Sequence, residues 1–228
     1  MRAILPSIAP AIVELAPDFR ALSISVDAAA IVNSGIATAA LSLACQSLST
    51  GEAAWADAHL LAWAEVFRQF GAKPQRTPCS ADALRKRVLR DGTMANIDPV
   101  VDLYNAVSIR YAIAVGGENA AAYVGTPTLT LADGSELFDT IKEGAPAHEH
   151  PDAGEVVWRD DLGVTCRRWN WRQGVRTRLD AHAKEMWFIL ESLPEMPLDA
   201  LHAAGEELMS GLRQMMPGAE IESMLVGV

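Results

Sequence analysis

The chain has 228 residues and a formal net charge of −10 at pH 7, and half of its residues are apolar. That length and apolar fraction indicate a globular protein with a sizeable buried core rather than a disordered chain. The acidic balance excludes a general nucleic-acid coat protein, whose footprint is a basic face.

The first 64 residues predict one strand and two helices. Apolar residues alternate with serines over 21–26, which is typical of a strand. Residues 28–48 are uncharged, but they are mostly Ala, Ser, Thr and Gly, which gain little from lipid. We therefore expect a buried helix there and no membrane span. A second helix is expected over 52–70, with His59 on its apolar stripe as a core histidine rather than a ligand.

Two further helices follow. A short basic helix is expected over 80–90, with Ser80 as its cap. The next helix has the clearest start signal, because Asp98 is a suitable cap and Pro99 suits the first helical position. Gly116 and Gly117 predict its end. Its polar residues form a ladder beside the apolar face, and their spacing favours ties to neighbouring backbone over ligand contacts. They are Asp102, Asn105 and Ser108.

The second half of the chain predicts hairpins. One pairs 126–131 with 136–141 around Asp133-Gly134, and another pairs 155–159 with 164–171. An exposed loop is expected over 143–154. The chain then ends in a strand over 186–193, a helix over 197–216 and a short strand over 221–226. Hairpins among helices predict an α+β fold, with a mixed, largely antiparallel sheet packed against helices.

Motifs for cofactors and metals are weak or missing. No nucleotide-binding glycine loop, GxSxG elbow or HExxH motif occurs, so no cofactor is expected. His148 and His150 flank a carboxylate in the exposed loop, but no further ligand accompanies them, so no metal is expected. The three cysteines are isolated and odd in number, which favours a reduced, cytoplasmic protein.

Charge is distributed unevenly along the chain. Residues 67–115 and 156–184 each carry a net charge of +4, and the segments around them are acidic. If these two basic islands meet in space, they form a local anion site on an acidic body. In the alternative, each island pairs with the acidic segment beside it. The sequence leaves both readings open.

The most unusual run lies in the second island, from Arg167 to Gln173. On a continuous strand, Arg168 and Asn170 share one face, and Trp169 and Trp171 share the other. Guanidinium groups bind phosphates, indole rings stack on bases, and amides offer donors and acceptors. This mixture suits the end of an RNA strand or an amino acid joined to it. In the alternative, one tryptophan fills the core and an arginine stacks on it.

Two segments carry a family resemblance. Residues 98–105 resemble the PVVDxxN element in the editing domain of the bacterial phenylalanyl-tRNA synthetase beta chain, called the B3/B4 domain. Residues 154–161 and 166–171 resemble free-standing proteins built from that domain alone. The resemblance covers about 65–195, so we expect one compact domain over 1–228, with 1–64 and 196–228 flanking this core. Nothing resembles the synthetase's catalytic core, so the chain is not expected to make aminoacyl-tRNA.

The synthetase domain hydrolyses wrongly attached tyrosine from tRNA, and the resemblance implies a related pocket. A histidine-bearing PLHAFD segment of the synthetase is replaced by residues 115–118 in this chain. Ester hydrolysis in such a pocket requires a positioned water and oxyanion donors more than a fixed nucleophile. Catalytic roles are expected for Asn105, Glu118 and Asn170. Substrate-binding roles are expected for Asp102, Ser108, Gly116, Gly117, Arg159, Arg167, Arg168, Trp169, Trp171 and Arg172.

Two main hypotheses follow. In the first, the protein binds the aminoacyl end of tRNA and hydrolyses a mischarged ester, with Arg159, Arg167, Arg168 and Arg172 on the terminal phosphates. In the second, it binds a free amino acid or small carboxylate without catalysis, which the acidic body favours. An unrelated enzyme or an interaction module is a third reading. No DNA or membrane partner is expected, and the oligomeric state stays open.

Overall fold

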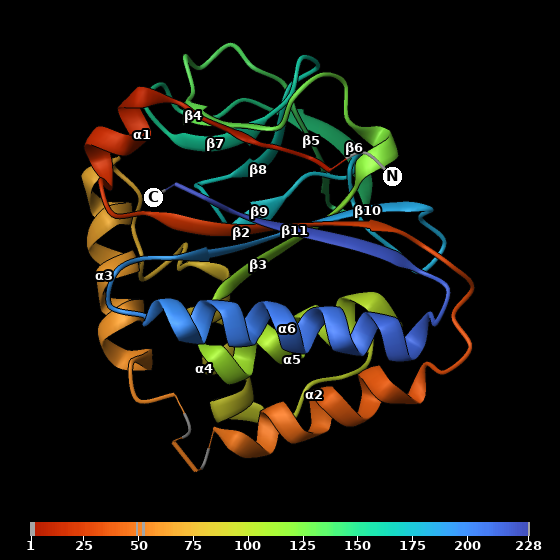
Figure 1. The fold of residues 1–228 in the computed structure, drawn as a ribbon. Helices are drawn as coiled ribbons and strands as arrows, with labels where there is room; N and C mark the ends of the chain where they lie inside the picture. Colours follow the sequence, from red (N-terminus) through yellow and green to blue (C-terminus); the bar gives the residue numbers. More distant parts are fainter. Residues whose placement is uncertain (1–2, 49, 52, 228) are drawn as a thin grey trace.

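Two β-sheets lie one above the other, and a layer of helices lies against the outer face of one of them, in a computed structural model that describes residues 3–48, 50–51 and 53–227 (Figure 1). The helix-covered sheet has the order β11-β2-β10-β3, and all its neighbours are antiparallel. Its strands are β2 (Arg20–Asp27), β3 (Ala114–Asn119), β10 (Glu185–Ser192) and β11 (Glu220–Val226).

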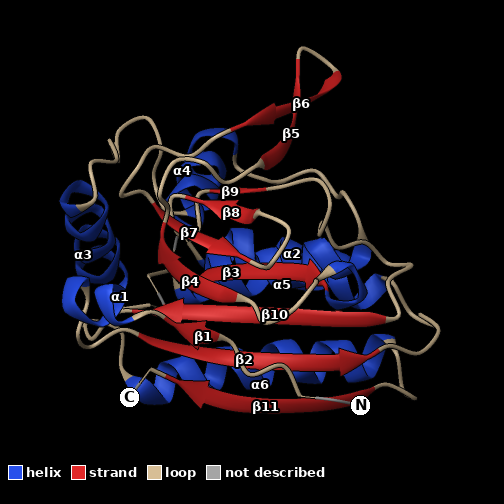
Figure 2. Cartoon of the chain, turned by 90° about the horizontal axis from the view of Figure 1, so that it is seen from above, coloured by secondary structure: helices blue, strands red, loops and turns tan. Residues whose placement is uncertain are grey.

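The second sheet has the order β1-β4-β7-β8-β5-β6, with β9 paired to β8. Two of its pairings, β1 with β4 and β5 with β8, are parallel, and the others are antiparallel. The β5–β6 hairpin projects from the body of the protein (Figure 2). The strands are β1 (Ser7–Ile8), β4 (Thr128–Leu131), β5 (Phe138–Lys142), β6 (Ala145–Glu149), β7 (Val156–Arg159), β8 (Val164–Arg167) and β9 (Arg172–Gln173).

Helices α2, α5 and α6 lie below the first sheet in Figure 1, and α3 stands at one side. The mixture of helices with largely antiparallel strands confirms the predicted α+β fold. The helical elements are α1 (Pro10–Leu15), α2 (Gly35–Ser47), α3 (Ala56–Gln69), α4 (Ser80–Asp91), α5 (Pro99–Tyr111), the 3-10 helix η1 (Ala120–Ala122) and α6 (Leu198–Met215).

Strands β2 and β10 of the first sheet are buried on both faces because helices lie on one side and the second sheet lies on the other. Phe188 and Leu190 of β10 pack with the helices, whereas Trp187 and Ile189 belong to the core between the two sheets. Even Ser23 of β2, on the face that alternation marks as polar, is buried, and its hydroxyl accepts a hydrogen bond from Trp187 Nε1 at 2.9 Å. The helices and the second sheet thus enclose β3 and β10, the strands that carry the candidate site.

Helix α5 begins as predicted but ends earlier. The Asp98 carboxylate accepts hydrogen bonds from the backbone of Val100 and Val101, which confirms it as the cap. Ala112 then adopts a left-handed conformation (φ 51°), and the chain enters β3, so the prediction that Gly116 and Gly117 end the helix is wrong. The cap of α4 is Cys79 rather than Ser80, which is the first helical residue.

Several other predicted boundaries are corrected. The helix expected over 28–48 begins only at Gly35, and position 52 of the next predicted helix lies outside the described residues. The hairpin expected around Asp133-Gly134 is wrong, because β4 pairs with β1 and β7 while β5 pairs with β6 and β8. The loop expected over 143–154 contains β6, which turns back from β5 through Glu143 and Gly144, both with positive φ.

The remaining strands and the last helix fall close to their predicted ranges. All three cysteines are free thiols. Among the described residues, no helix combines the length and the apolar character that a membrane crossing requires.

Candidate functional site

A cavity of about 290 Å³ lies between β3 and β10, the start of α4, and the segment from Trp169 to Gln173. Its volume is at the lower end of the roughly 300–1,000 Å³ typical of ligand pockets, which suits a ligand the size of an amino acid better than a whole nucleotide. Aromatic rings make up much of the wall. The lining residues from the sheet and the 169–173 segment include Glu118, Trp158, Cys166, Trp169, Asn170, Trp171, Gln173, Trp187, Ile189 and Glu191.

The floor of the cavity is one face of the β3–β10 pair. Glu118 stands opposite Trp187 in the strand register, so both side chains leave the same face of the sheet, and Glu191 follows four residues later on that face. The positions of Glu118 and Glu191 are therefore about 13 Å apart along the strand direction. Two carboxyl groups thus mark the two ends of the cavity floor.

Glu191 is fully satisfied by its neighbours. Its Oε1 accepts hydrogen bonds from Trp158 Nε1 at 2.9 Å and from Trp169 Nε1 at 3.0 Å. Its Oε2 accepts from Asn170 Nδ2 at 3.0 Å. Burial raises the pKa of Glu191 to about 7, while these three donors lower it. Glu191 therefore holds three side chains in place around one end of the cavity.

A break in the strand brings Trp169 and Asn170 to the same carboxylate. Arg168 and Trp169 have positive φ values of 48° and 63°, so β8 ends at Arg167 and the predicted alternation of faces over 164–171 is wrong. Trp169 N donates to Val156 O at 2.7 Å, and Arg168 N donates to Glu155 Oε1 at 3.1 Å. These bonds hold a turn of two non-glycine residues, a conformation that side chains disfavour.

Trp169 belongs to the core as well as to the cavity wall. It is fully buried, and its ring packs edge-on against Phe19 and Trp63, with 5.2 Å between ring centroids in each case. Its indole nitrogen is bonded to Glu191. The ring is therefore enclosed by protein, as the alternative interpretation of the Arg-Trp run expected for one tryptophan.

At the opposite end of the cavity, a carboxyl oxygen lacks a hydrogen-bond partner among the described residues. Glu118 is 4% exposed, and its Oε2 is buried without a hydrogen-bond partner among the described residues. Burial raises the pKa of Glu118 to about 8, against the lowering influence of Thr177 and Gln173. Two further lining atoms, Asn170 Oδ1 and Ser80 Oγ, are buried and unpartnered within the same described part of the chain.

The orientation of Asn170 follows from Glu191. Because Glu191 takes the Nδ2 donor, the amide presents its oxygen as the free atom. Gln173 is fixed in a similar way, since its Nε2 donates to Gly117 O at 2.6 Å. Buried polar groups in folded proteins are normally paired, so unpartnered atoms at Glu118 and Asn170 mark places where a ligand or a water supplies the donor.

The arginines expected to grip phosphates are engaged with carboxylates. Arg167 is buried and donates to both oxygens of Glu155, at 2.9 and 2.8 Å, and to Glu149 at 3.0 Å. Arg159 pairs with Glu136 at 3.4 Å. These contacts match the alternative in which the basic island pairs with the acidic segment beside it.

Trp171 is flanked by two arginines at the edge of the cavity. The Arg168 guanidinium lies 4.6 Å from the ring centroid of Trp171, and that of Arg172 lies 5.8 Å from it. Arg168 is also 3.6 Å from Glu155. Arg172 donates to Thr140 Oγ1 at 2.8 Å. The stacking expected between Trp171 and a base thus competes with the arginines already at its ring.

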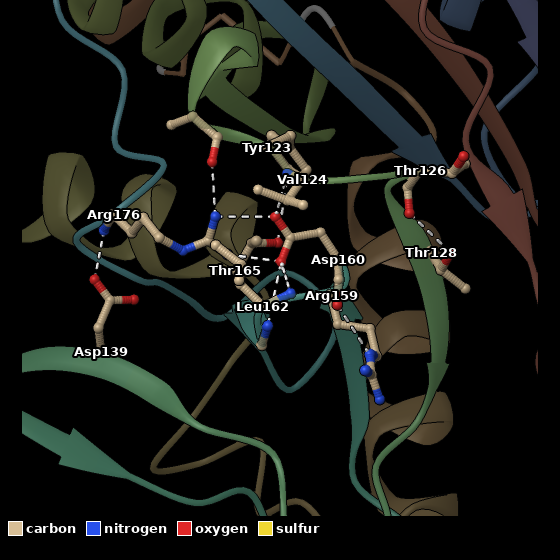
Figure 3. Close-up of polar contacts among 12 residues, drawn as sticks. Tyr123, Val124, Thr126, Thr128, Asp139, Arg159, Asp160, Leu162, Thr165 and Arg176 are labelled. Carbon is tan, nitrogen blue, oxygen red and sulfur yellow. Dashed lines mark hydrogen bonds and ion pairs between the residues drawn. The ribbon is translucent and has the colours of Figure 1, made fainter.

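Arg176 and Asp160 form the most heavily bonded pair near the site (Figure 3). Two guanidinium nitrogens of Arg176 donate to the two Asp160 oxygens, at 2.9 and 2.7 Å. Asp160 also accepts from the backbone of Val124, Leu162 and Gly163. This pair therefore ties the segment after η1, the β7–β8 turn and the 174–178 segment together.

The cations of the first basic island, within residues 67–115, fall into two groups. Arg85 donates to Ile109 O at 2.6 Å, and Lys86 pairs with Asp82 at 2.7 Å. Lys73 and Arg76, by contrast, line a second groove of about 520 Å³, together with Arg168, Asp152 and Glu155. This groove and the cavity use consecutive residues of the 168–171 segment as walls. The two islands thus meet at this groove and not inside the cavity.

The three residues of the predicted polar ladder on α5 have different surroundings in the structure. Asp102 accepts hydrogen bonds from Asn96 Nδ2 at 2.8 Å and from the backbone of Ile97 at 2.9 Å, which fixes the entry to the helix. Ser108 Oγ donates to Ile113 O at 2.6 Å and closes the turn after it. Asn105 lines the cavity. Two of the three therefore make the backbone ties that their spacing favours.

The glycine pair of β3 allows close packing at the cavity. A Cβ on Gly117 would lie 2.8 Å from the Tyr104 ring, and one on Gly116 would lie 3.1 Å from Ile189. Both glycines line the cavity, as do Tyr104 and Glu191, which the sequence argument did not single out. For Glu191 a signal existed, because a carboxylate within an apolar strand is rarely buried without a purpose.

The histidines lie outside the cavity. His59 is buried, bonded to Ala112 O and Leu193 N at 2.9 and 3.0 Å, and burial lowers its pKa to about 4, so it is the predicted core histidine. His150 contacts the carbonyls of Ser135 and Glu136. Within the described ranges, no group of three or more His, Cys, Asp and Glu side chains is placed to hold a metal ion.

Comparison with known proteins places this geometry in context. A family model described as the B3/4 domain matches residues 62–198. No curated protein matches the chain. The matched range includes α4, α5, both strands of the cavity floor and the 168–173 segment.

Proposed function

The chain belongs to the B3/4 domain family, and on that premise we propose that its cavity receives the aminoacyl end of a tRNA and hydrolyses a mischarged ester. The observation that carries this proposal is the pair of unpartnered acceptors, on Glu118 and Asn170, in a cavity of about 290 Å³. Buried acceptors without donors cost free energy, so a site that keeps them is suited to a ligand that brings donors.

The proposed reaction is ester hydrolysis. A water attacks the ester carbonyl, the bond between that carbon and the ribose oxygen breaks, and the proton of the water ends on the ribose oxygen. Asn105 and Asn170 are suited to position the water and the developing oxyanion, and Glu118 is suited to hold the amino acid. The tyrosine preference of the synthetase domain is not carried over, because residues 115–118 replace its histidine-bearing segment.

For the RNA itself, we assign the cations of the second groove. Lys73 and Arg76 stand on its wall, next to the turn that separates the groove from the cavity. The arginines expected for this task, Arg159 and Arg167, are held by carboxylates. Two or three phosphate contacts on an acidic body give weak binding with a shallow salt dependence.

The test is a deacylation assay over a panel of mischarged tRNAs, combined with tRNA binding at several salt concentrations. We expect turnover of at least one mischarged tRNA. Replacing Lys73 and Arg76 together by alanine weakens tRNA binding and reduces the salt slope by about two, with the fold unchanged. Absence of both turnover and salt-dependent binding for every tRNA overturns the proposal.

One observation favours a second function, binding of a free amino acid without RNA. The arginines of the second island make ion pairs within the protein, which leaves fewer cations for a nucleic acid. In that case a free amino acid raises the melting temperature at millimolar concentration while tRNA has no effect. A panel of the free amino acids, each tested beside tRNA, separates the two functions.

A further inference from the structure

The titratable side chains that the structure describes in the cavity lining are all acids, with no basic group among them. Glu118 and Glu191 are its two carboxyl groups, and they are 4% and 1% exposed. None of the described residues in the lining is a lysine, an arginine or a histidine. The remaining polar lining atoms belong to hydroxyl, amide, thiol and indole groups. A ligand in this cavity therefore meets carboxyl groups and neutral dipoles, and no fixed positive charge.

A free amino acid is poorly matched to such a lining. Its carboxylate would be taken out of water without a cation to pair with, beside groups that themselves carry or can carry negative charge. Its ammonium group, by contrast, would find the unpartnered Oε2 of Glu118. An ester or amide of the same amino acid keeps the ammonium group and has no carboxylate.

We infer that the cavity selects amino acids whose carboxyl group is esterified or amidated, with the free ammonium group bound at Glu118 and the free acids excluded. The inference rests on the proposed function and deepens it, because an aminoacyl group on tRNA is such an ester. It also decides between the two candidate functions, since a receptor for free amino acids needs a cation for the carboxylate.

Glu118, and not Glu191, is the ammonium acceptor because only Glu118 has a free oxygen. Both oxygens of Glu191 already accept hydrogen bonds, from two indoles and an amide. The free oxygen of Asn170 lies at the Glu191 end, since its amide nitrogen is bonded to that carboxylate, and is suited to a neutral donor. The cavity is thus polar at both ends, but only the Glu118 end has a carboxyl oxygen without a partner among the described residues.

The cations nearest to Glu118 stand outside the lining. Arg176 is held by both oxygens of Asp160 and donates to Ala122 O at 2.7 Å. Arg178 forms a backbone bridge with Glu118, but its side chain is not among the lining groups. If a ligand carboxylate does enter, Arg178 is the residue best placed to meet it, which makes its variant a useful control.

The experiment is a thermal-shift titration of the full chain at neutral pH with three matched series. The first contains the amides of L-amino acids with small, aliphatic and aromatic side chains. The second contains the same amino acids as free acids, and the third contains their N-acetyl amides. We expect at least one amide to raise the melting temperature, with its free acid and its N-acetyl amide binding at least about tenfold more weakly.

Two variants report on the contact itself. Glu118→Gln keeps the shape of the protonated carboxyl but cannot ionise beside a bound ammonium group, and is expected to reduce amide affinity by about tenfold or more. Glu222→Gln, on the exposed edge strand β11, is the matched control and is expected to bind like the wild type. Equal binding of an amide and its free acid overturns the inference. So does a rise in melting temperature with a free acid that Arg178→Gln abolishes. The absence of a rise with every amide overturns it as well.

The outcomes separate this inference from the proposed function. Amide-selective binding without turnover of any mischarged tRNA upholds the cavity preference and overturns the hydrolase. Turnover of mischarged tRNA together with equal binding of amides and free acids upholds the hydrolase and overturns the cavity preference.

Discussion

Two buried glutamates on one face of one sheet have different hydrogen-bonding surroundings in this protein. Glu191 is surrounded by three donors, from Trp158, Trp169 and Asn170. Glu118, at the other end of the same cavity floor, keeps an oxygen without a partner among the described residues. Burial raises the pKa of both, to about 7 for Glu191 and about 8 for Glu118.

The difference indicates that burial alone does not mark a functional carboxylate. Both groups are buried, but protein donors reach both oxygens of Glu191, whereas one oxygen of Glu118 has no donor among the described residues, although Thr177 and Gln173 lower its pKa. Glu191 therefore builds the cavity wall, and Glu118 is free to contact what enters it. Variants of the two glutamates and of Asn170 test this division between a supporting and a receiving carboxylate.

The largest effect is expected from Glu191→Ala. The change leaves two indole N–H groups and one amide without an acceptor in the core, and it opens a void. The free energy of unfolding should fall by about 3–5 kcal/mol. Urea denaturation measures this, with Glu222→Ala on the exposed edge strand as the control. A loss below about 1 kcal/mol would show that Glu191 is not the support described here.

Next in size is the pH dependence that Glu118 imposes on stability. Its pKa is raised on folding, so the folded state holds a proton that the unfolded chain has lost between the ordinary pKa of 4.5 and about 8. Its stabilising contribution is complete below that window and is lost as pH rises through it. The wild type should therefore lose about 1.4 kcal/mol per pH unit relative to Glu118→Gln, which cannot ionise.

Urea unfolding of the two proteins at about pH 5.5 and about pH 7.5 tests this slope. A constant difference between them would contradict the raised pKa. The other charged and titratable groups around Glu118 are unchanged in the variant, so they cancel in the comparison. They are Arg176, Arg178, Asp139, Tyr104, Tyr123 and Cys166.

A smaller effect is expected from Asn170→Ala. Glu191 keeps its two indole donors, so only one hydrogen bond is lost, and the free energy of unfolding should fall by about 1–2 kcal/mol. Amide binding in the cavity should weaken as well, because the free amide oxygen disappears. Chemical denaturation and the thermal-shift titration measure the two effects separately. If Asn170→Ala lowers the free energy of unfolding as much as Glu191→Ala does, Glu191 is not the support that holds Asn170.

Much of the architecture is predictable from local patterns. The Asp98 cap, the strands over 20–27 and 185–192, and the last helix follow from residues close to one another in the chain. The errors occur where distant segments decide. An alanine, not a glycine, adopts the left-handed conformation that ends α5, so no sequence signal marked the start of β3. Strand β4 pairs with β7 and not with β5, the next strand in the chain, so the residues of the adjacent turn do not reveal its partner.

The candidate site shows the same limit. Glu118 and Asn170 were singled out, and both lie in the cavity. The arginines around Asn170 have the right chemistry for phosphate, but carboxylates that are 12 to 18 residues away in sequence already hold Arg167. Pairing of this kind depends on strand order, which residue types alone do not specify. The role of Glu191 depends on the turn at Arg168 and Trp169, which alternation does not predict.

The central claim is that Glu118 receives the aminoacyl group, and deacylation kinetics test it most directly. The wild type, Glu118→Gln and the Glu222→Gln control are compared on the mischarged tRNA that the panel identifies. We expect kcat/KM to fall by about tenfold to a hundredfold in Glu118→Gln, chiefly through KM, and to be unchanged in the control. Equal kcat/KM for Glu118→Gln and the wild type, or no turnover of any mischarged tRNA, would contradict the account.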